Sequence, residues 1–140
     1  MKFEYLTDAR SKTTIGGPKK RPVVEVIISN GGKSREFLAV IDSGADVTTM
    51  STAVAEVFGI DWKRCAKQNL LGISGVVQDS YVGSLDIRVK KMSETLTLPV
   101  VFTEANIPIL LGQEGFFDFY RIKFEKDHDL FEIYRFVRRK

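Results

Sequence analysis

The sequence predicts an all-β domain, built as a closed barrel or a sandwich, with one or two short helices. Hydrophobic residues alternate with polar ones over several short segments, and turn-forming residues separate these segments. Only one segment has clear helical spacing. The chain has 140 residues, of which 44% are hydrophobic and 28% charged, so it can build one core but not two full-sized ones.

The first predicted strands pair as a hairpin. A β-branched run from Val23 to Ile28 ends at the turn Asn30-Gly31-Gly32, and a second apolar run spans Phe37 to Ile41. The mostly polar residues 1–22 are expected to be a leader, a loop or an extra strand. The domain itself is then expected to occupy residues 23–140.

One clear helix follows, and the strand pattern then resumes. Ser51 is a favoured N-cap residue, and apolar residues recur at helical spacing up to Phe58, before Gly59 ends the helix. A second short helical turn is predicted near Glu114–Phe119. Further strands are predicted over four segments: Tyr81–Val89, Thr95–Phe102, Tyr120–Phe124 and Leu130–Val137.

Composition excludes several kinds of site. Cys65 is the only cysteine and His128 the only histidine, so a disulfide within the chain and a Cys/His zinc cluster are excluded. His128 lies in the polar turn Lys126-Asp127-His128-Asp129, which argues against a histidine-based catalytic triad. Acid/base chemistry is therefore expected to fall to carboxylates.

The charge balance favours no nucleic-acid partner. The chain has 21 Lys and Arg against 18 Asp and Glu, a net charge of +3. Its basic clusters, Lys19-Lys20-Arg21 and Arg138-Arg139-Lys140, are interpreted as solubilising segments. No apolar run suits a signal peptide or a membrane span, and the lone cysteine fits a reducing compartment. We therefore expect a cytoplasmic protein with no membrane partner.

The most informative segment lies at the end of the second predicted strand. Apolar residues Leu38 to Ile41 lead directly to Asp42-Ser43-Gly44-Ala45-Asp46. A carboxylate beside an apolar core is costly unless it is paired or hydrogen-bonded, so Asp42 is a candidate functional acid. The alternative is an ordinary turn that ends the strand, since Asp, Ser and Gly all favour turns.

Three segments, in order, resemble those of the retropepsin-like aspartic proteases. Asp42-Ser43-Gly44-Ala45-Asp46 is similar to the active-site motif of that family, and Gly72-Ile73-Ser74-Gly75-Val76 is similar to its glycine-rich flap tip. Ile109-Leu110-Leu111-Gly112 is similar to its hydrophobic-hydrophobic-Gly segment. The resemblance covers the chain from about Val23 onward, and it implies a closed barrel of the retropepsin type.

The resemblance also implies a homodimer that cleaves peptide bonds. Aspartic-protease chemistry uses two facing carboxylates, and this chain has a single Asp-Ser-Gly string, so each subunit would supply one Asp42. By the same resemblance, the Ser43 hydroxyl crosses the dimer axis and the Gly44 backbone lies beside the carboxylates. Asp42, Ser43 and Gly44 are the expected catalytic residues, and no metal or cofactor is implied.

Substrate contacts are expected from the active-site motif and the flap. The resemblance assigns them to Ala45 and Asp46, and to the flap residues Gly72, Ile73, Ser74, Gly75 and Val76. Two alternatives stay open: Asp46 as a cap before the helix, and the two glycines as an ordinary hairpin turn. The substrate itself would be a peptide or a protein.

Two features bear on the dimer. Retroviral members have an arginine at the position of Gln113, and this arginine pairs with the acid at the position of Asp46. The Gln113 amide can hydrogen-bond Asp46 but cannot neutralise its charge. The apolar terminal strand Leu130–Val137 is a candidate interface strand, and the alternative is that it completes the barrel of its own subunit.

Three functions from different classes are compatible with the sequence. The intact Asp42-Ser43-Gly44 string favours a homodimeric aspartic endopeptidase. A retropepsin-like dimerisation or binding module with little or no proteolysis is the alternative, because a fold does not determine a function. A nucleic-acid-binding β-barrel rests only on the basic clusters and finds no support from aromatic residues interleaved with them.

Overall fold

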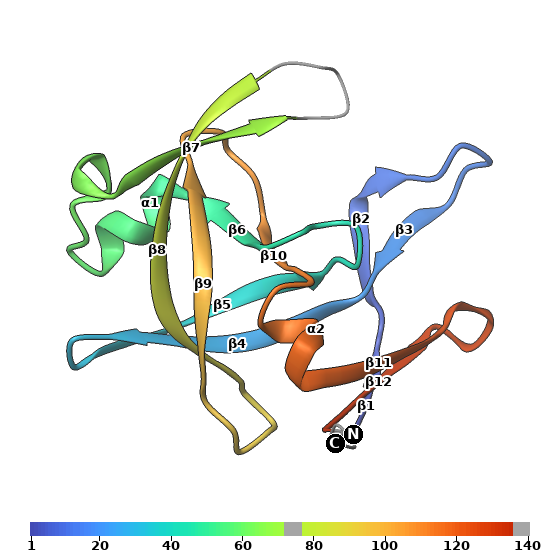
Figure 1. Ribbon diagram of the computed structural model, residues 1–140. Coiled ribbons are helices and arrows are strands. Elements are labelled where there is room, and N and C mark those ends of the chain that lie inside the picture. The colour runs from blue at the N-terminus through green and yellow to red at the C-terminus, as the bar shows by residue number, and fades with distance from the viewer. Residues whose placement is uncertain (72–76, 136–140) are drawn as a thin grey trace.

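A closed barrel forms the centre of the computed structural model, which describes residues 1–71 and 77–135 (Figure 1). Within these residues, six strands pair in the order β4-β5-β10-β6-β9-β8, and β8 pairs with β4 to close the ring. The predicted closed barrel is thereby confirmed. Its strands are β4 (Val23–Asn30), β5 (Lys33–Ile41), β6 (Thr48–Ser51), β8 (Val77–Val89), β9 (Leu96–Thr103) and β10 (Ile109–Leu111).

The hairpin of β4 and β5 shows why the chain folds this way locally. The two strands pair from Val23↔Val40 to Asn30↔Lys33. Gly31 and Gly32 make the turn with positive φ angles of 56° and 83°, which glycine adopts at little cost. Alternation along the strands then points three β4 side chains and two β5 side chains into the core: Val24, Val26, Ile28, Ala39 and Ile41.

Two short helices pack against strands of the barrel. In α1 (Thr52–Val57), the Ser51 hydroxyl accepts a hydrogen bond from the Ala53 N–H at 3.2 Å, so the predicted N-cap is confirmed. The 3₁₀ helix η1 (Trp62–Arg64) places the Trp62 ring 4.9 Å from the ring of Tyr81. Strand β7 (Ala66–Leu71) then pairs with β8, and the two extend beyond the barrel (Figure 1).

The C-terminal segments build a second sheet. After α2 (Phe116–Phe119), strands β11 (Tyr120–Glu125) and β12 (Leu130–Arg135) pair around the 3₁₀ turn η2 (Lys126–His128). Strand β1 (Lys2–Glu4) pairs with the other edge of β12, and Phe3 stacks on Phe131 at 5.4 Å. The second predicted helical turn and the predicted strand at Tyr120–Phe124 are thereby confirmed, and the predicted strand Leu130–Val137 is confirmed as far as Arg135, where the described residues end.

This arrangement corrects one expectation for the terminal strand, and its role in a dimer interface stays a prediction. Over its described residues, β12 is the middle strand of the order β1-β12-β11. Its β11 edge is paired along Leu130–Arg135, and β1 pairs with Leu130–Glu132 on the other edge. β12 lies in a separate sheet from the barrel, so it does not complete the barrel.

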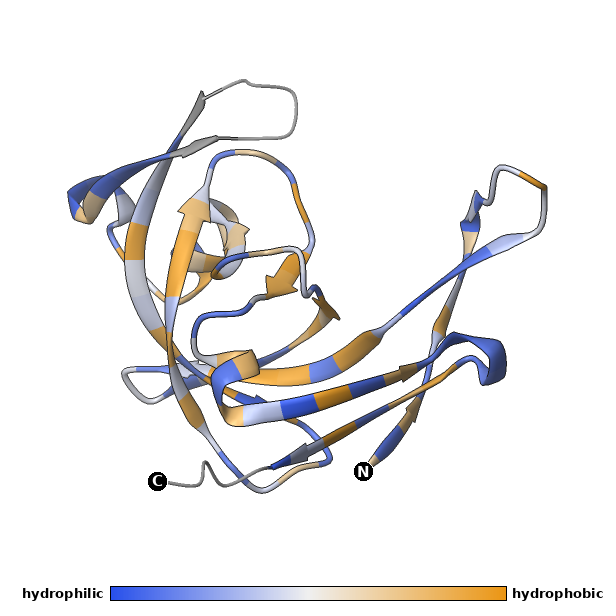
Figure 2. Ribbon diagram, turned by 45° about the vertical axis from the view of Figure 1, so that its right-hand side comes forward, coloured by the Kyte–Doolittle hydropathy of each residue, from blue (hydrophilic) through white to orange (hydrophobic). Residues whose placement is uncertain are grey.

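Residues 6–21 contain a two-stranded hairpin of β2 (Leu6–Lys12) and β3 (Pro18–Arg21). It projects from the rest of the fold (Figure 2). The exposed Ile15 lies in the turn between its two strands. The boundary between residues 1–22 and the predicted domain stays a prediction. Among the described residues, no helix has the length and apolar character that crossing a membrane would need.

Candidate active site

The loop of residues 42–47 connects two strands that share one neighbour. Strand β5 ends at Ile41 and β6 begins at Thr48, and β10 lies between them. β10 runs parallel to β5, with Leu111 opposite Ile41, and antiparallel to β6, with Leu110 opposite Thr49. Asp42 therefore lies where the ends of two neighbouring strands meet.

Backbone hydrogen bonds hold the loop to the end of β10 and to the residues after it. The Asp42 N–H donates to the Leu111 carbonyl at 3.0 Å. Gln113 and Glu114 donate their N–H groups to the carbonyls of Ala45 and Asp46, at 2.8 and 2.9 Å. These bonds make the position of the Asp42 loop depend on the Ile109–Gly112 segment, although about 70 residues separate the two in the chain.

Gly112 occupies a place that no side chain can share. A Cβ atom there would lie 2.5 Å from the Val47 carbonyl carbon and 2.8 Å from the Ala45 oxygen. The Gly112 N–H donates to the buried Thr48 hydroxyl at 3.3 Å, which provides a partner for a donor enclosed in the core. The glycine of the hydrophobic-hydrophobic-Gly segment thus lets two backbone segments approach closely.

The Asp42 carboxyl group is half-buried, and the loop itself provides it with a donor. Its Oδ1 atom accepts a hydrogen bond from the Gly44 N–H at 2.9 Å, and its main-chain carbonyl accepts one from Ala45 at 3.2 Å. Ser43 and Gly44 are exposed beside it. The arrangement presents an oriented carboxylate at the surface, with a small side chain and a glycine next to it.

The structure brings five of the predicted site residues into this one loop: Asp42, Ser43, Gly44, Ala45 and Asp46. Asp46 is exposed and is not the helix cap, because Ser51 caps α1. The interpretation of Asp46 as that cap was therefore wrong. The predicted flap residues Gly72, Ile73, Ser74, Gly75 and Val76 lie outside the described residues; the flanking strands β7 and β8 pair as an antiparallel hairpin.

Two contacts at the site could not be predicted from the sequence. The Gln113 side-chain amide donates to the Ser43 carbonyl at 2.7 Å, rather than making the bond to Asp46 that the retroviral pattern implies. The hydroxyl of Thr48 holds the N–H of Gly112. A weak signal for Thr48 exists: it is two residues before Met50 on a strand, so both side chains face the core.

Comparisons with solved structures identify the fold. A retropepsin-like aspartic protease from Rickettsia conorii is 15% identical in sequence and superposes with a TM-score of 0.58, over 94% of this chain and 99% of that one. EIAV protease complexed with the inhibitor HBY-793 is 21% identical, with a TM-score of 0.48, over 68% of this chain and 84% of that one.

Comparison with families of sequences identifies the family. A search of curated proteins finds no significant match. The sequence model of the family described as "Aspartyl protease" matches residues 24–114, which is more than half of the chain and includes both the Asp42 loop and Gly112. The chain therefore belongs to the aspartyl protease family, and its fold is retropepsin-like.

Proposed function

We propose that this chain is a homodimeric aspartic endopeptidase in which each subunit contributes one Asp42. The observation that carries the proposal is the Asp42 loop itself: a half-buried carboxylate, held by the Gly44 N–H and presented where β5 and β10 end. Family membership supports peptidase activity of this class. The single Asp-Ser-Gly string of the sequence supports a site that is shared between two chains.

The chemistry of a facing pair of carboxylates explains the mechanism. Two carboxylates a few ångströms apart cannot both stay ionised, so they share one proton. The ionised Asp42 takes a proton from a water molecule as this water attacks the peptide carbonyl carbon. The protonated Asp42 of the other subunit donates a hydrogen bond to the oxygen on which negative charge develops.

The residues around Asp42 have matching roles in this proposal. The Gly44 N–H orients one oxygen of the carboxylate, and the absence of a side chain at Gly44 leaves room beside it. Ser43 is exposed next to Asp42, where its hydroxyl can reach the loop of a second subunit. The Gln113 amide holds the Ser43 carbonyl and so orients the peptide between Ser43 and Gly44.

Replacing the carboxylate tests the proposal. Asp42→Asn keeps the size of the side chain but removes the group that accepts and donates the proton, and we expect peptidase activity to fall by about 10²–10⁴-fold. Asp127→Asn is the matched control, because its side chain is 77% exposed in the η2 turn, outside the site. The substrates are unfolded proteins, assayed across acidic and neutral pH with and without a chelator.

The outcomes separate the peptidase from the binding module. The proposal predicts activity that is highest at acidic pH, is unaffected by chelators and is lost only in Asp42→Asn. Unchanged proteolysis in the Asp42→Asn protein would refute it. A folded protein that binds polypeptides and does not cleave them at any pH would instead support the binding module.

A further inference from the structure

The proposed mechanism does not use the hairpin of β2 and β3. Among the described residues, β2 and β3 pair only with each other. An isolated two-stranded hairpin is marginally stable in water, so contacts outside the hairpin must help to hold it. Its cations, Arg10, Lys12, Lys19, Lys20 and Arg21, are all exposed.

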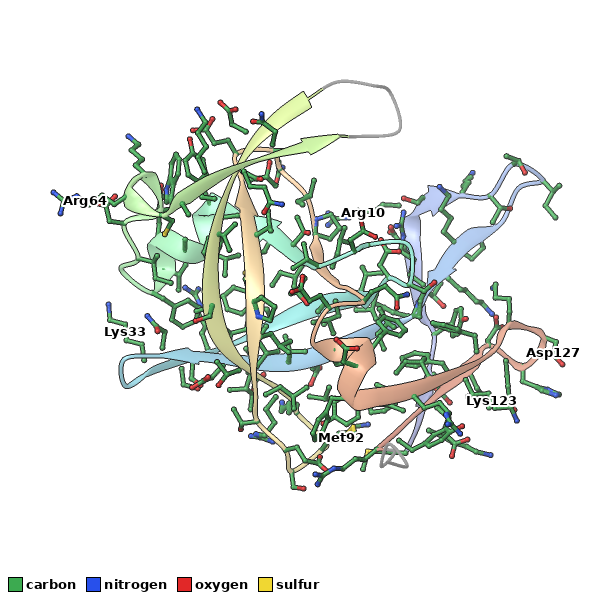
Figure 3. All side chains as sticks on the ribbon, viewed as in Figure 1. Arg10, Lys33, Arg64, Met92, Lys123 and Asp127 are labelled. Atoms are coloured by element: carbon green, nitrogen blue, oxygen red, sulfur yellow. The ribbon has the colours of Figure 1, made fainter. Side chains whose placement is uncertain are left out.

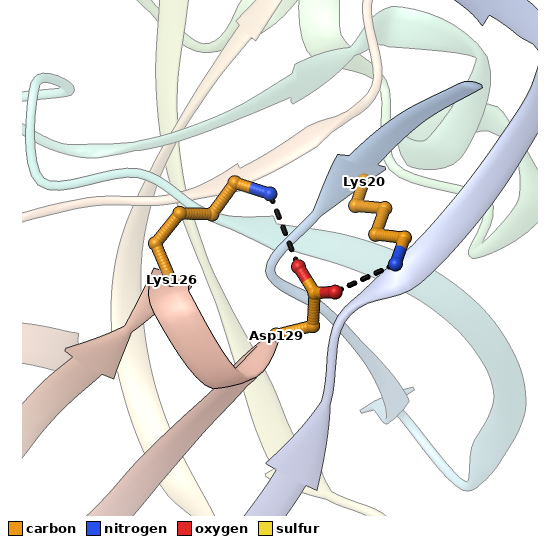
Figure 4. A network of polar contacts seen from close by, with 3 residues as sticks. All are labelled: Lys20, Lys126 and Asp129. Atoms are coloured by element: carbon orange, nitrogen blue, oxygen red, sulfur yellow. Dashed lines mark hydrogen bonds and ion pairs between the residues drawn. The ribbon is translucent and has the colours of Figure 1, made fainter. Parts of the chain in front are cut away.

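An ion-pair network fixes the base of this hairpin to the C-terminal sheet (Figure 4). Lys20 of β3 reaches Asp129 at 2.6 Å, and Lys126 reaches the other carboxylate oxygen at 3.2 Å. Asp129 also accepts the Tyr5 N–H on its main-chain carbonyl at 2.8 Å, directly before β2 begins. The two lysines hold the pKa of Asp129 below its ordinary value, so its carboxylate stays charged at neutral pH.

A groove of about 600 Å³ separates β2 from the outward face of the barrel. Leu6 lines it from the hairpin, and Leu38 and Val40 line it from β5. Leu6 is 46% exposed and Leu38 is 56% exposed, so two large apolar side chains face solvent in one hollow. Exposed apolar surface gathered in a hollow is typical of a binding site.

This groove lies along the strand that leads to the candidate active site. Val40 lines the groove near the end of β5, two residues before Asp42 in the chain. Pro108 also lines the groove and directly precedes β10, whose Leu111 carbonyl holds the Asp42 N–H. A polypeptide bound across Asp42 would therefore lie only a few residues along β5 and β10 from the groove.

The charges in the groove are unequal. Arg10 and Arg21 line it together with Asp8 (Figure 3, Arg10 labelled). The Asp8 carboxylate accepts a hydrogen bond from the Arg10 main-chain N–H at 3.0 Å, so its position is set by its own strand. Two guanidinium groups against one carboxylate leave the groove with a net positive charge, beside its apolar wall.

We propose that the β2–β3 hairpin forms one wall of the substrate groove, and that Arg10 and Arg21 select polypeptides with an acidic side chain next to an apolar one. This inference rests on the proposed endopeptidase function and assigns it a substrate class. The apolar side chain packs against Leu38 and Val40, and the acidic one pairs with the guanidinium groups. Lys20 and Asp129 act as positioning residues, because they hold the hairpin at its distance from the barrel.

Paired peptides that differ only by Glu or Gln beside an apolar residue test the proposal. Their binding is measured by fluorescence anisotropy on the Asp42→Asn protein, so the test does not depend on turnover. Arg10→Glu should weaken binding of the Glu peptide by about fivefold to tenfold, and leave the Gln peptide within about twofold. The preference should also shrink as salt concentration rises.

Lys12→Glu is the matched control, because it makes the same charge change on the same strand but does not line the groove. Equal loss in Arg10→Glu and Lys12→Glu would overturn the proposal, since it would show only non-specific attraction. A Glu preference that Arg10→Glu leaves intact would overturn it too. The dimer is measured by sedimentation in Arg10→Glu and Leu38→Glu. If either variant weakens the dimer and leaves the peptide preference unchanged, the groove holds a second copy of the chain instead, and the proposal is overturned.

Cleavage of the same peptides by the unsubstituted protein separates this inference from the proposed function. If the preference for Glu is found in binding and no peptide is cleaved, the groove assignment stands and the endopeptidase proposal fails. If peptides are cleaved without a preference for Glu that depends on Arg10, the endopeptidase stands and the groove assignment fails.

Discussion

Substituting Gly112 by Ala perturbs the contact that holds the Asp42 loop. The new Cβ would lie 2.5 Å from the Val47 carbonyl carbon and 2.6 Å from its oxygen, both in the backbone, so the two segments must separate. Separation weakens the bonds from Gln113 to Ala45 and from Glu114 to Asp46. Overpacking costs about 1–3 kcal/mol and each of the two hydrogen bonds about 0.5–1.5 kcal/mol, so we expect a loss of about 2–6 kcal/mol.

Thermal and denaturant unfolding measure this loss. A destabilisation of that size lowers the midpoint temperature by about 8–24 °C for a chain of this length. Gly44→Ala is the comparison, because its Cβ would meet only the Asp42 Oδ1 atom, at 3.2 Å. We expect that variant to lose activity while keeping its stability. A Gly112→Ala protein whose free energy of unfolding stayed within about 0.5 kcal/mol of the original would refute the argument.

Two further predictions follow from single contacts. Gln113→Ala removes the side-chain amide that donates to the Ser43 carbonyl at the surface. We expect kcat to fall several-fold and the free energy of unfolding to change by less than about 1 kcal/mol. An unchanged kcat would contradict the role of Gln113 in positioning Ser43. Burial and the nearby charge of Glu94 raise the pKa of the Tyr120 hydroxyl to about 12, from an ordinary value of 10. The unfolded chain releases the hydroxyl proton at lower pH than the folded chain does, so the free energy of unfolding should fall as pH rises from about 10 to 12. Equilibrium denaturation of Tyr120→Phe should show a shallower fall over the same pH range. Equal pH slopes for the two proteins would contradict that assignment.

The strands that the sequence predicts are those with one buried face. In β8, Leu85, Ile87 and Val89 are buried and alternate with polar residues, so the period of two is visible in the sequence. The hairpin of β2 and β3 has polar side chains on both faces, and such strands have no alternation to detect. β10 is three residues long, and its place between β5 and β6 depends on pairing across the chain rather than on local pattern.

The same distinction applies to the site. Asp42 is predictable because an acid at the end of an apolar strand is unusual in itself. The contacts of Gln113 with Ser43 and of Thr48 with Gly112 exist only because β10 inserts between β5 and β6, so no local pattern reports them. The apolar residues of the terminal strand predict an interface, which stays a prediction; the structure shows that two of them, Phe131 and Ile133, are buried within the subunit.

Mixing subunits tests the central claim, that two Asp42 side chains from two chains form one active site. Asp42→Asn protein is added in an equal amount to the original protein, with differently tagged chains to verify that subunits exchange. If each site needs both carboxylates, mixed dimers are inactive, and activity per original chain should fall to about half at equal amounts and further with excess variant. Activity per original chain that stays constant while mixed dimers form would contradict the shared site.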